Sequence, residues 1–263
     1  MRTPPRRIRT KLERRQTAYG IAVQLPSPEI VEVIGYTGYD FAWLDCEHGS
    51  FDLSDLRQLI RAADAAGVDA LVRPRDDDPG TIGQILDLGA AGVVVPDVRT
   101  LRQACEIVAA TRYAPAGTRG ACPGGRAVGH LTQDWVGDYQ RADRDVLCFG
   151  IIEHPEGVDH VEDIASQSGL DGLMFGPFDL AMHLGLDGDV RHPDLIAMQQ
   201  RLVAATRSAG IEYVSPNAGW ETDLAATGSR VIPVSGDRVA LVKTLLRLKA
   251  DVTGQPAPTT AIA

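Results

Sequence analysis

The chain has 263 residues, of which 44% are hydrophobic and 23% charged, and its formal net charge at pH 7 is -9. This composition is that of a globular protein able to bury a core, and it argues against an intrinsically disordered chain. The negative charge argues against a general binder of nucleic acid, because such proteins concentrate Lys and Arg against the phosphates.

The N-terminus is the exception to the negative charge. Its first fifteen residues contain one acid, Glu13, and the basic residues Arg2, Arg6, Arg7, Arg9, Lys11, Arg14 and Arg15. No apolar run follows them, as a secretory signal would require, and no stretch approaches the roughly 18 consecutive apolar residues of a membrane span. We therefore expect a cytoplasmic protein with a basic N-terminal tail over residues 1–15, solvated over residues 3–10 and leading into a short helix.

From residue 16 onward, apolar β-rich runs alternate with segments of helical period, which is typical of β-α units around a parallel sheet. The strands are expected at Gly20–Leu25, Asp40–Cys46, Ala70–Pro74, Gly92–Val98, Val146–Glu153, Gly172–Gly176, Glu212–Ser215 and Arg230–Val234. The helices are expected at Pro28–Ile34, Leu53–Ala66, Thr81–Leu88, Leu101–Thr111, Val158–Ser168, Leu195–Ala209, Glu221–Ala226 and Arg238–Leu248. Residues 114–145 have no clear period and are expected to be a long irregular loop, which in a compact domain is usually functional or disordered.

Eight such units predict a single-domain (β/α)8 TIM barrel over residues 16–251, followed by a flexible C-terminal tail over residues 252–263. A doubly wound open sheet is the alternative. It is disfavoured because no G-x-G-x-x-G motif follows the first strand.

Polar side chains follow several expected strands at their C-terminal ends, where a barrel of this kind carries its active site. Asp45 and His48 follow the second strand, Arg73 ends the third, Glu153 ends the fifth and Asp179 follows the sixth. We interpret this set as a candidate catalytic site.

Glu153 and Asp179 would project from neighbouring strand ends, where two carboxylates repel each other unless a cation lies between them. Two carboxylates completed by water and substrate oxygens suit Mg²⁺, Mn²⁺ or Co²⁺. The alternative is that each carboxylate caps the helix that follows it. Gly176 and Pro177 leave the backbone bare just before Asp179, so N–H groups there are candidates to hold a substrate carboxylate.

His48 follows Asp45 by three residues, a spacing at which the carboxylate can fix the imidazole tautomer for acid–base chemistry. An exposed loop histidine is the alternative. Arg73 presents a planar fork of donors suited to an enolate or carboxylate oxygen, or to a structural salt bridge with one of the aspartates at 76–78.

Several motifs occur in one order along the chain: Ser27-Pro28, Asp45-Cys46-Glu47-His48, Val72-Arg73-Pro74, Leu86-Asp87-Leu88-Gly89-Ala90, Val95-Pro96, Arg112-Tyr113-x-Pro115-x-Gly117-x-Arg119-Gly120, Ile152-Glu153 and Gly176-Pro177-x-Asp179-Leu180. In this order they resemble the HpcH/HpaI class II pyruvate aldolases, a group that is related to macrophomate synthase. The resemblance covers most residues from about 20 to 245.

The resemblance implies that Glu153 and Asp179 bind a divalent metal ion, which chelates pyruvate or a similar 2-oxo acid. It also implies that His48, oriented by Asp45, is the acid–base group, and that Arg73 stabilises the developing enolate. Asp87 is expected in the second layer around the site.

The backbone of residues 176–179, with Gly176, Pro177, Phe178 and Asp179, is expected to hold the substrate carboxylate. Such proteins are commonly trimers of dimers that exchange their last helix. We therefore expect a homohexamer in which Arg238–Leu248 packs on a neighbouring subunit.

Three departures from the family pattern concern the substrate side of the site. Ile151 replaces a Gln common two residues before the metal-binding Glu, Ala181 replaces a common Ser, and residues 121–130 do not read like the usual aldolase segment. The leading hypothesis is reversible cleavage of a 4-hydroxy-2-oxo acid into pyruvate and an aldehyde. The alternatives are decarboxylation of oxaloacetate with addition of the enolate to another acceptor, as in macrophomate synthase, cleavage of an acyl-coenzyme A thioester, and a catalytically silent barrel.

Overall fold

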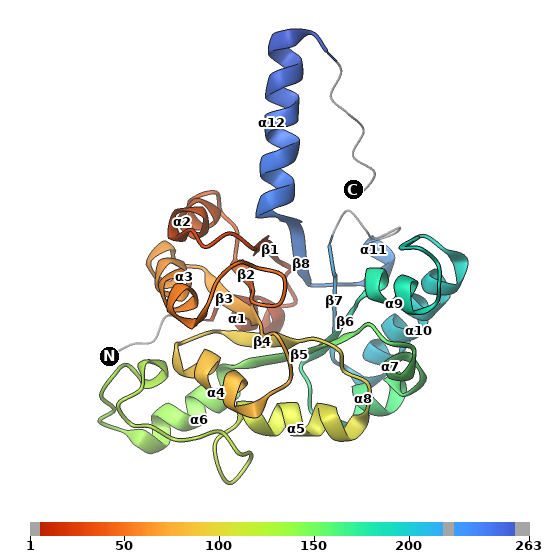
Figure 1. Ribbon diagram of the computed structural model, residues 1–263. Coiled ribbons are helices and arrows are strands. Elements are labelled where there is room, and N and C mark those ends of the chain that lie inside the picture. Colours follow the sequence, from red (N-terminus) through yellow and green to blue (C-terminus); the bar gives the residue numbers. More distant parts are fainter. Residues whose placement is uncertain (1–5, 218–223, 256–263) are drawn as a thin grey trace.

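The computed structural model describes residues 6–217 and 224–255. Its eight strands pair side by side in chain order, all parallel, and β8 pairs with β1 to close the barrel (Figure 1). The strands are β1 (Ala18–Val23), β2 (Phe41–Asp45), β3 (Asp69–Arg73), β4 (Gly92–Val95), β5 (Leu147–Ile152), β6 (Gly172–Phe175), β7 (Glu212–Val214) and β8 (Val231–Gly236). The predicted TIM barrel is confirmed.

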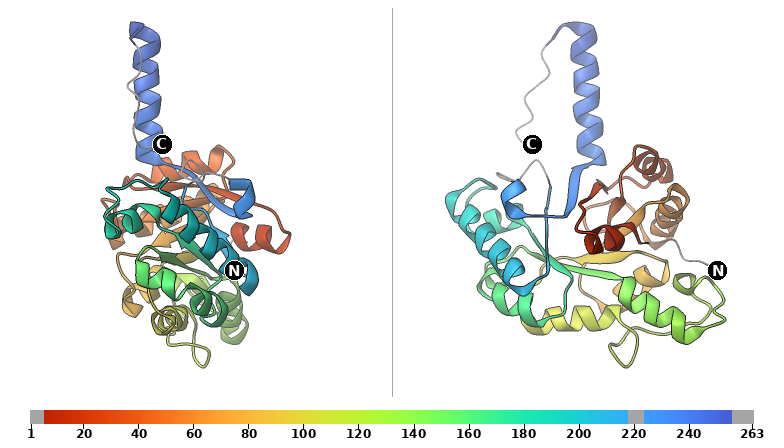
Figure 2. Two further views of the ribbon diagram at one scale, coloured as in Figure 1. Left: turned by 90° about the vertical axis from the view of Figure 1, so that its right-hand side faces the viewer. Right: turned by 180° about the vertical axis from the view of Figure 1, so that it is seen from behind.

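Helices lie between the strands and surround the barrel (Figures 1 and 2). They are α1 (Arg7–Glu13), α2 (Pro28–Tyr36), α3 (Leu53–Ala66), α4 (Pro79–Asp87), α5 (Leu101–Thr111), α6 (Trp135–Asp145), α7 (Pro155–Asp159), α8 (Val161–Gln167), α9 (Pro177–His183), α10 (Pro193–Ala209), α11 (Leu224–Thr227) and α12 (Asp237–Thr253), with a 3-10 turn η1 at Arg126–Val128. In the described ranges no helix is long and apolar enough to cross a membrane.

Helix α3 shows how local sequence sets these boundaries. The Asp52 side chain accepts hydrogen bonds from the Ser54 and Asp55 amides, which would otherwise lack partners at the helix start. The helix ends at Gly67, whose φ of 72° is in the left-handed region that glycine adopts without a Cβ clash. Between these ends one face, including Leu56 and Ile60, is fully buried.

The barrel has two apolar layers because successive strand residues point to opposite faces. On β2, Phe41 and Trp43 belong to the cluster inside the barrel, whereas Ala42 and Leu44 belong to the cluster between the barrel and its helices. Both faces are therefore covered, which explains why the strands read as continuous apolar runs.

The pairing of β7 with β8 is the shortest of the eight strand pairings. It consists of the single register pair Val214–Val231, whereas β1 and β8 pair over five residues. We call this short junction between β7 and β8 the seam of the barrel.

Over residues 6–15, the basic N-terminal segment is not the solvated tail that its charge pattern suggested. The expected short helix forms as α1, and its Ile8 side chain is fully buried in the interior cluster at the N-terminal end of the barrel. The Ile8 amide donates to Asp69 Oδ2 at 2.8 Å, and Lys11 and Arg9 pair with Asp40 and Asp171 at 2.6 and 2.9 Å. Arg9 and Lys11 thus neutralise carboxylates at the base of the barrel.

The expected irregular loop at 114–145 also differs from the prediction, because its last third is helix α6. None of the α6 residues is buried, so no fully buried apolar face marked this helix in the sequence.

Helix α12 leaves the barrel and projects away from it (Figures 1 and 2). Asp237 in its first turn is the one buried residue of α12, and the helix continues to Thr253, inside the segment expected to be flexible. Residues 256–263 of that expected tail, and residues 221–223 of the expected seventh helix, lie outside the described residues.

Candidate active site

A cavity of about 400 Å³ lies at the C-terminal end of the barrel strands. This volume is within the range of small-molecule sites. Its lining includes the predicted residues Asp45, His48, Arg73, Glu153, Gly176, Pro177, Phe178 and Asp179. The structure thus brings together side chains from four separate strand ends, as the barrel topology predicts.

Glu153 follows β5 and is only 8% exposed. Its Oε1 accepts a hydrogen bond of 2.7 Å from the Asp97 amide. A Cβ atom on Gly176 would lie 2.4 Å from the Glu153 Cβ, so the absence of a side chain at 176 is what lets Glu153 occupy this place. Burial, followed by the charges of Glu47 and Asp179, raises the pKa of Glu153 to about 7.

The donor set fits a hard divalent cation. Glu153 and Asp179 both line the cavity, and the negative charges of Glu47 and Asp179 add to burial in raising the pKa of Glu153, so a cation there would be stabilising. Among the described residues no group of three or more His, Cys, Asp or Glu could hold a metal ion. Mg²⁺ needs no such cluster, since it is commonly bound by one or two carboxylates with water and substrate oxygens.

Arg73 is fixed by two carboxylates. Its Nε and Nη2 donate to Asp45 Oδ1 and Oδ2 at 2.8 and 2.7 Å, and its Nη1 lies 3.0 Å from Glu47 Oε2. The guanidinium also stacks 5.1 Å from the ring centre of Trp43. Burial would lower the pKa of Arg73, but the hydrogen bonds and charge of Asp45 outweigh it and the pKa is raised.

The alternative of a salt bridge between Arg73 and residues 76–78 is wrong. In the part of the chain that the structure describes, Arg73 pairs with Asp45 and Glu47 and with none of Asp76, Asp77 and Asp78. The charged end of Arg73 therefore stays at the cavity.

Asp45 does not orient the His48 ring as expected. Its Oδ1 accepts from the backbone amides of Glu47 and His48, both at 3.2 Å, and its Oδ2 accepts from Gln24 Nε2 at 2.8 Å. Within the described residues, the ion-pair partner of the His48 ring is Glu47, at 3.8 Å between Nε2 and Oε2. Both Asp45 oxygens are bonded to Arg73, and Asp45 bonds to His48 through the main-chain amide instead of the ring.

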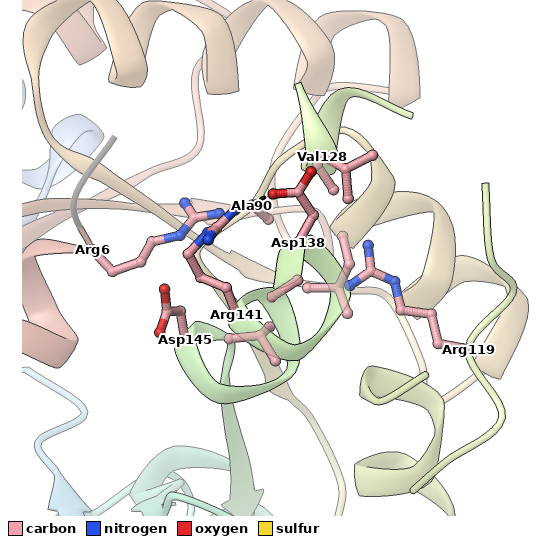
Figure 3. Close-up of a pocket in the computed structure, with 11 residues that line it drawn as sticks. Arg6, Ala90, Arg119, Val128, Asp138, Arg141 and Asp145 are labelled. Atoms are coloured by element: carbon pink, nitrogen blue, oxygen red, sulfur yellow. Dashed lines mark hydrogen bonds and ion pairs between the residues drawn. The ribbon is translucent and has the colours of Figure 1, made fainter. Parts of the chain in front are cut away.

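Asp87 lies at the other end of the barrel, where α4 ends. Its Oδ1 accepts a 2.8 Å hydrogen bond from Arg119 Nη2. Arg119 lines a second cavity, of about 40 Å³, in which Arg141 pairs with Asp138 (Figure 3). That space holds only a few water molecules, at roughly 10–15 Å³ each. The described lining of the larger cavity does not include Asp87.

Sequence reasoning missed several groups at the site, among them three side chains and one backbone group that bond to or stack on the predicted residues. Gln24 and Glu47 follow strands β1 and β2 and bond to Asp45 and Arg73, so their position after apolar runs was a usable signal. In the sequence, Trp43 was interpreted only as one apolar residue of a strand. The Asp97 amide that holds Glu153 leaves no trace in the residue type.

Of the three departures from the family pattern, only Ile151 is among the described residues that line the cavity. Ile151 lines it and is 2% exposed, next to Met174, so this wall is apolar. Ala181 is fully buried. Of the residues that line the cavity in the described protomer, none comes from segment 121–130.

Comparison with known proteins identifies the family. A family model described as HpcH/HpaI aldolase/citrate lyase matches residues 19–242. The chain belongs to this family. The resemblance seen in the motifs is confirmed, and so is the expectation of a carbon–carbon lyase of the aldolase type.

HpcH/HpaI relatives match the chain over nearly its full length. It is 34% identical to the hydroxypyruvate/pyruvate aldolase of Delftia acidovorans, with 98% of each chain covered. A solved HpcH/HpaI aldolase/citrate lyase family protein from Burkholderia cenocepacia is 31% identical, with 94% of this chain and 99% of that chain covered and a TM-score of 0.86. Macrophomate synthase is 26% identical, with coverages of 97% and 94% and a TM-score of 0.83.

Proposed function

We propose that the protein is a divalent-metal-dependent aldolase that reversibly cleaves a 4-hydroxy-2-oxo acid into pyruvate and an aldehyde. The observation that carries the proposal is that one cavity of about 400 Å³ holds both the Glu153–Asp179 carboxylates and the Arg73 guanidinium. Enolate chemistry needs positive charge at the carbonyl oxygen, which Arg73 would supply directly and the two carboxylates would supply through a bound cation.

Glu153 and Asp179 would hold Mg²⁺, Mn²⁺ or Co²⁺, which would supply the Lewis-acid charge that stabilises an enolate. The protein itself would hold the Glu153 side chain rigidly in position for the metal ion. The Asp97 amide fixes one Glu153 oxygen, and Gly176 leaves space for the Glu153 side chain.

Arg73 would donate hydrogen bonds to the substrate carbonyl oxygen as negative charge develops there. Its guanidinium is already held by Asp45 and Glu47, so little reorganisation is needed during the reaction. Asp45 is the anchor of Arg73 in this scheme, because burial of its carboxyl group is outweighed by Arg73 and its pKa is lowered.

His48 would move the protons. In the cleavage direction it accepts the proton of the C4 hydroxyl while the C3–C4 bond breaks, the aldehyde leaves, and the bonding electrons pass to the enolate. Protonation of the enolate at C3 then gives the pyruvate methyl group. The His48 side chain is 58% exposed and faces Glu47 at 3.8 Å, so it can exchange protons with solvent.

The start of α9 would hold the substrate carboxylate. Gly176 at its N-cap supplies no side-chain cap, and Pro177 at the first helical position has no N–H to be satisfied. The amides of Phe178 and Asp179 in this first turn are therefore candidates for the carboxylate oxygens.

A second candidate, decarboxylation of oxaloacetate with addition of the enolate to another acceptor, is favoured by the apolar wall. Ile151 and Met174 supply no polar group to that part of the cavity. An apolar wall suits a weakly polar acceptor better than a hydrated hydroxyaldehyde. The likeness to macrophomate synthase supports the same idea.

The deciding experiment is pyruvate in deuterated buffer, with and without Mg²⁺ or Mn²⁺, followed by NMR of the methyl protons. The proposed function requires methyl proton loss that depends on the metal and disappears in Glu153→Gln. Release of carbon dioxide from oxaloacetate without exchange of pyruvate would favour the second candidate. Inactivity in both assays would contradict both.

We further propose that the protein is a cytoplasmic homohexamer in which α12 packs on a neighbouring subunit. The support is that, within the described residues, α12 buries only Asp237 and exposes 50%, 56% and 52% of the area of Leu241, Leu245 and Leu248. Asp87, which lies far from its own cavity, would reach an active site only from a neighbouring subunit.

A further inference from the structure

Arg238, the second residue of α12, turns back from the projecting helix onto the active-site end of the barrel. Its Nη1 donates to the His48 carbonyl oxygen at 3.4 Å, and its Nη2 donates to the Gln24 carbonyl oxygen at 3.0 Å and to Ser50 Oγ at 2.7 Å. One side chain thus joins the loop after β1 to the loop after β2. Both loops carry residues that line the cavity.

Asp237 also holds the loop after β1, through hydrogen bonds to its backbone amides. It is 7% exposed, and its Oδ2 accepts from the Gln24 and Leu25 amides at 3.1 and 3.0 Å. Its Oδ1 accepts from the Arg238 amide at 2.6 Å. Gln24 is therefore held at both its N–H and its carbonyl by consecutive residues of α12.

Gln24 links the start of α12 to the side chains of the active site. Its Nε2 donates to Asp45 Oδ2, and Asp45 in turn binds the Arg73 guanidinium and the His48 amide. The His48 main chain is thus fixed by Asp45 at its N–H and by Arg238 at its carbonyl. Since no carboxylate lies within hydrogen-bond distance of the ring in the described structure, these main-chain contacts are what locate it.

We infer that Arg238 is a positioning residue for the acid–base group: it holds the His48 main chain and Gln24 in place and links the root of α12 to the active site. This inference rests on the proposed role of His48. A guanidinium suits the task because its several donors lie in one plane and reach three acceptors on two loops, whereas an ammonium group on a flexible stem does not fix that geometry.

The test compares Arg238→Gln and Arg238→Lys with Arg247→Gln, a control that makes the same charge change on the exposed surface of the same helix. With Mg²⁺ present, we expect Arg238→Gln to lower kcat for pyruvate methyl exchange roughly ten- to a hundredfold, the loss that a small misplacement of a catalytic group causes. KM for pyruvate should change less than about twofold, because the proposed metal ligands are untouched. Arg238→Lys should recover part of kcat, and Arg247→Gln should match the wild type.

A second measurement does not depend on turnover. In protein carrying ¹³C-labelled histidine, with the His48 signal assigned from His48→Gln, we expect the His48 ring resonance to shift or broaden in Arg238→Gln and to stay unchanged in Arg247→Gln. Light scattering on the same samples must show one assembly size for all variants.

Equal kcat and an unchanged His48 resonance in Arg238→Gln would overturn the inference. So would a loss of kcat that appears only with a smaller assembly, because Arg238 would then be a tether for α12 alone. If the wild type exchanges no pyruvate, the proposed function fails, and the His48 resonance still decides whether Arg238 positions that residue.

Discussion

Glu153 is buried next to two other carboxyl groups, and its pKa is about 7 in the folded protein against 4.5 for an ordinary glutamate. Between these two pH values the folded state binds more protons than the unfolded state does. The stability of the metal-free protein therefore falls as the pH rises from about 4.5 to about 7, and it is level above that range. The loss amounts to roughly 3 kcal/mol, at 1.36 kcal/mol for each unit of pKa.

Replacing Glu153 with Gln should remove this loss while keeping an acceptor for the Asp97 amide. We expect Glu153→Gln, in the presence of a chelator, to unfold at higher urea than the wild type at pH 8 and at nearly the same urea at pH 4.5. Glu156→Gln, on the exposed neighbouring helix position, is the control. A wild type whose urea midpoint is the same at both pH values would contradict the assignment.

Arg73 makes contacts that a lysine cannot copy, because its two-pronged bond to Asp45 needs a planar fork. We expect Arg73→Lys to lower the rate of pyruvate methyl exchange by about 10²- to 10³-fold. The nearby exposed Arg75→Lys should leave the rate unchanged. Retention of most of the rate in Arg73→Lys would show that a simple positive charge is enough at this position.

At the residue scale, the sequence predicted which strand ends carry the polar groups but not which groups bond to which. Asp45 was expected at the His48 ring, and it bonds to Arg73 because β2 and β3 place Asp45 and Arg73 opposite each other. That register is a property of the closed sheet and cannot be read from the spacing of Asp45 and His48. The Asp97 amide was out of reach for the same reason, since it is positioned by tertiary structure alone.

Helix α1 closes the N-terminal end of the barrel with one side chain. Ile8 is fully buried among residues inside the barrel, including Phe41 and Phe149. We expect Ile8→Ala to reduce the free energy of unfolding by about 2–5 kcal/mol, as truncation of a large buried side chain does. Val136→Ala, at a 55% exposed position on α6, should change it by less than about 0.5 kcal/mol. Equal urea midpoints for the two variants would show that α1 is dispensable.

At the element scale, a helix with a cap, a buried face and a terminal glycine was the easiest to predict, although α12 was also predicted without a buried face. Helix α3 has a cap, an apolar face and a terminal glycine, and its observed bounds equal the predicted ones. Helix α6 buries no residue and was read as loop. Helix α1 was found as a helix, but charge dominated its pattern and hid the single buried Ile8.

The whole molecule is a barrel from which helix α12 projects, and we call this helix the arm. On α12, the apolar residues Leu241, Leu245, Leu248 and Val252 recur at four- and three-residue steps, so they form one exposed stripe along the arm. We expect Leu245→Glu to convert the proposed hexamer into a smaller assembly, measured by light scattering after size exclusion. Thr244→Glu, which adds the same charge beside the stripe, should leave the size unchanged. A wild-type monomer would contradict the proposed assembly directly.

At this scale the architecture was the most predictable property. Eight apolar runs separated by helical segments leave few ways to bury every strand on both faces, and closure into a barrel is the simplest. The projection of α12 was predictable only through the family resemblance, because an exposed apolar stripe looks the same in sequence as one that packs on its own barrel.

The seam between β7 and β8 has a consequence for how the barrel opens. A single register pair, Val214–Val231, joins these strands, so parting them breaks fewer backbone hydrogen bonds than parting any other pair. The Ser215 amide, which donates to the Val231 carbonyl oxygen at 3.1 Å across this seam, should then exchange with deuterated solvent sooner than the amides of β2 and β3, which pair over five residues. Because β8 runs directly into α12, a neighbour that holds the arm would also slow the opening of the barrel wall, and dilution of the protein would speed it.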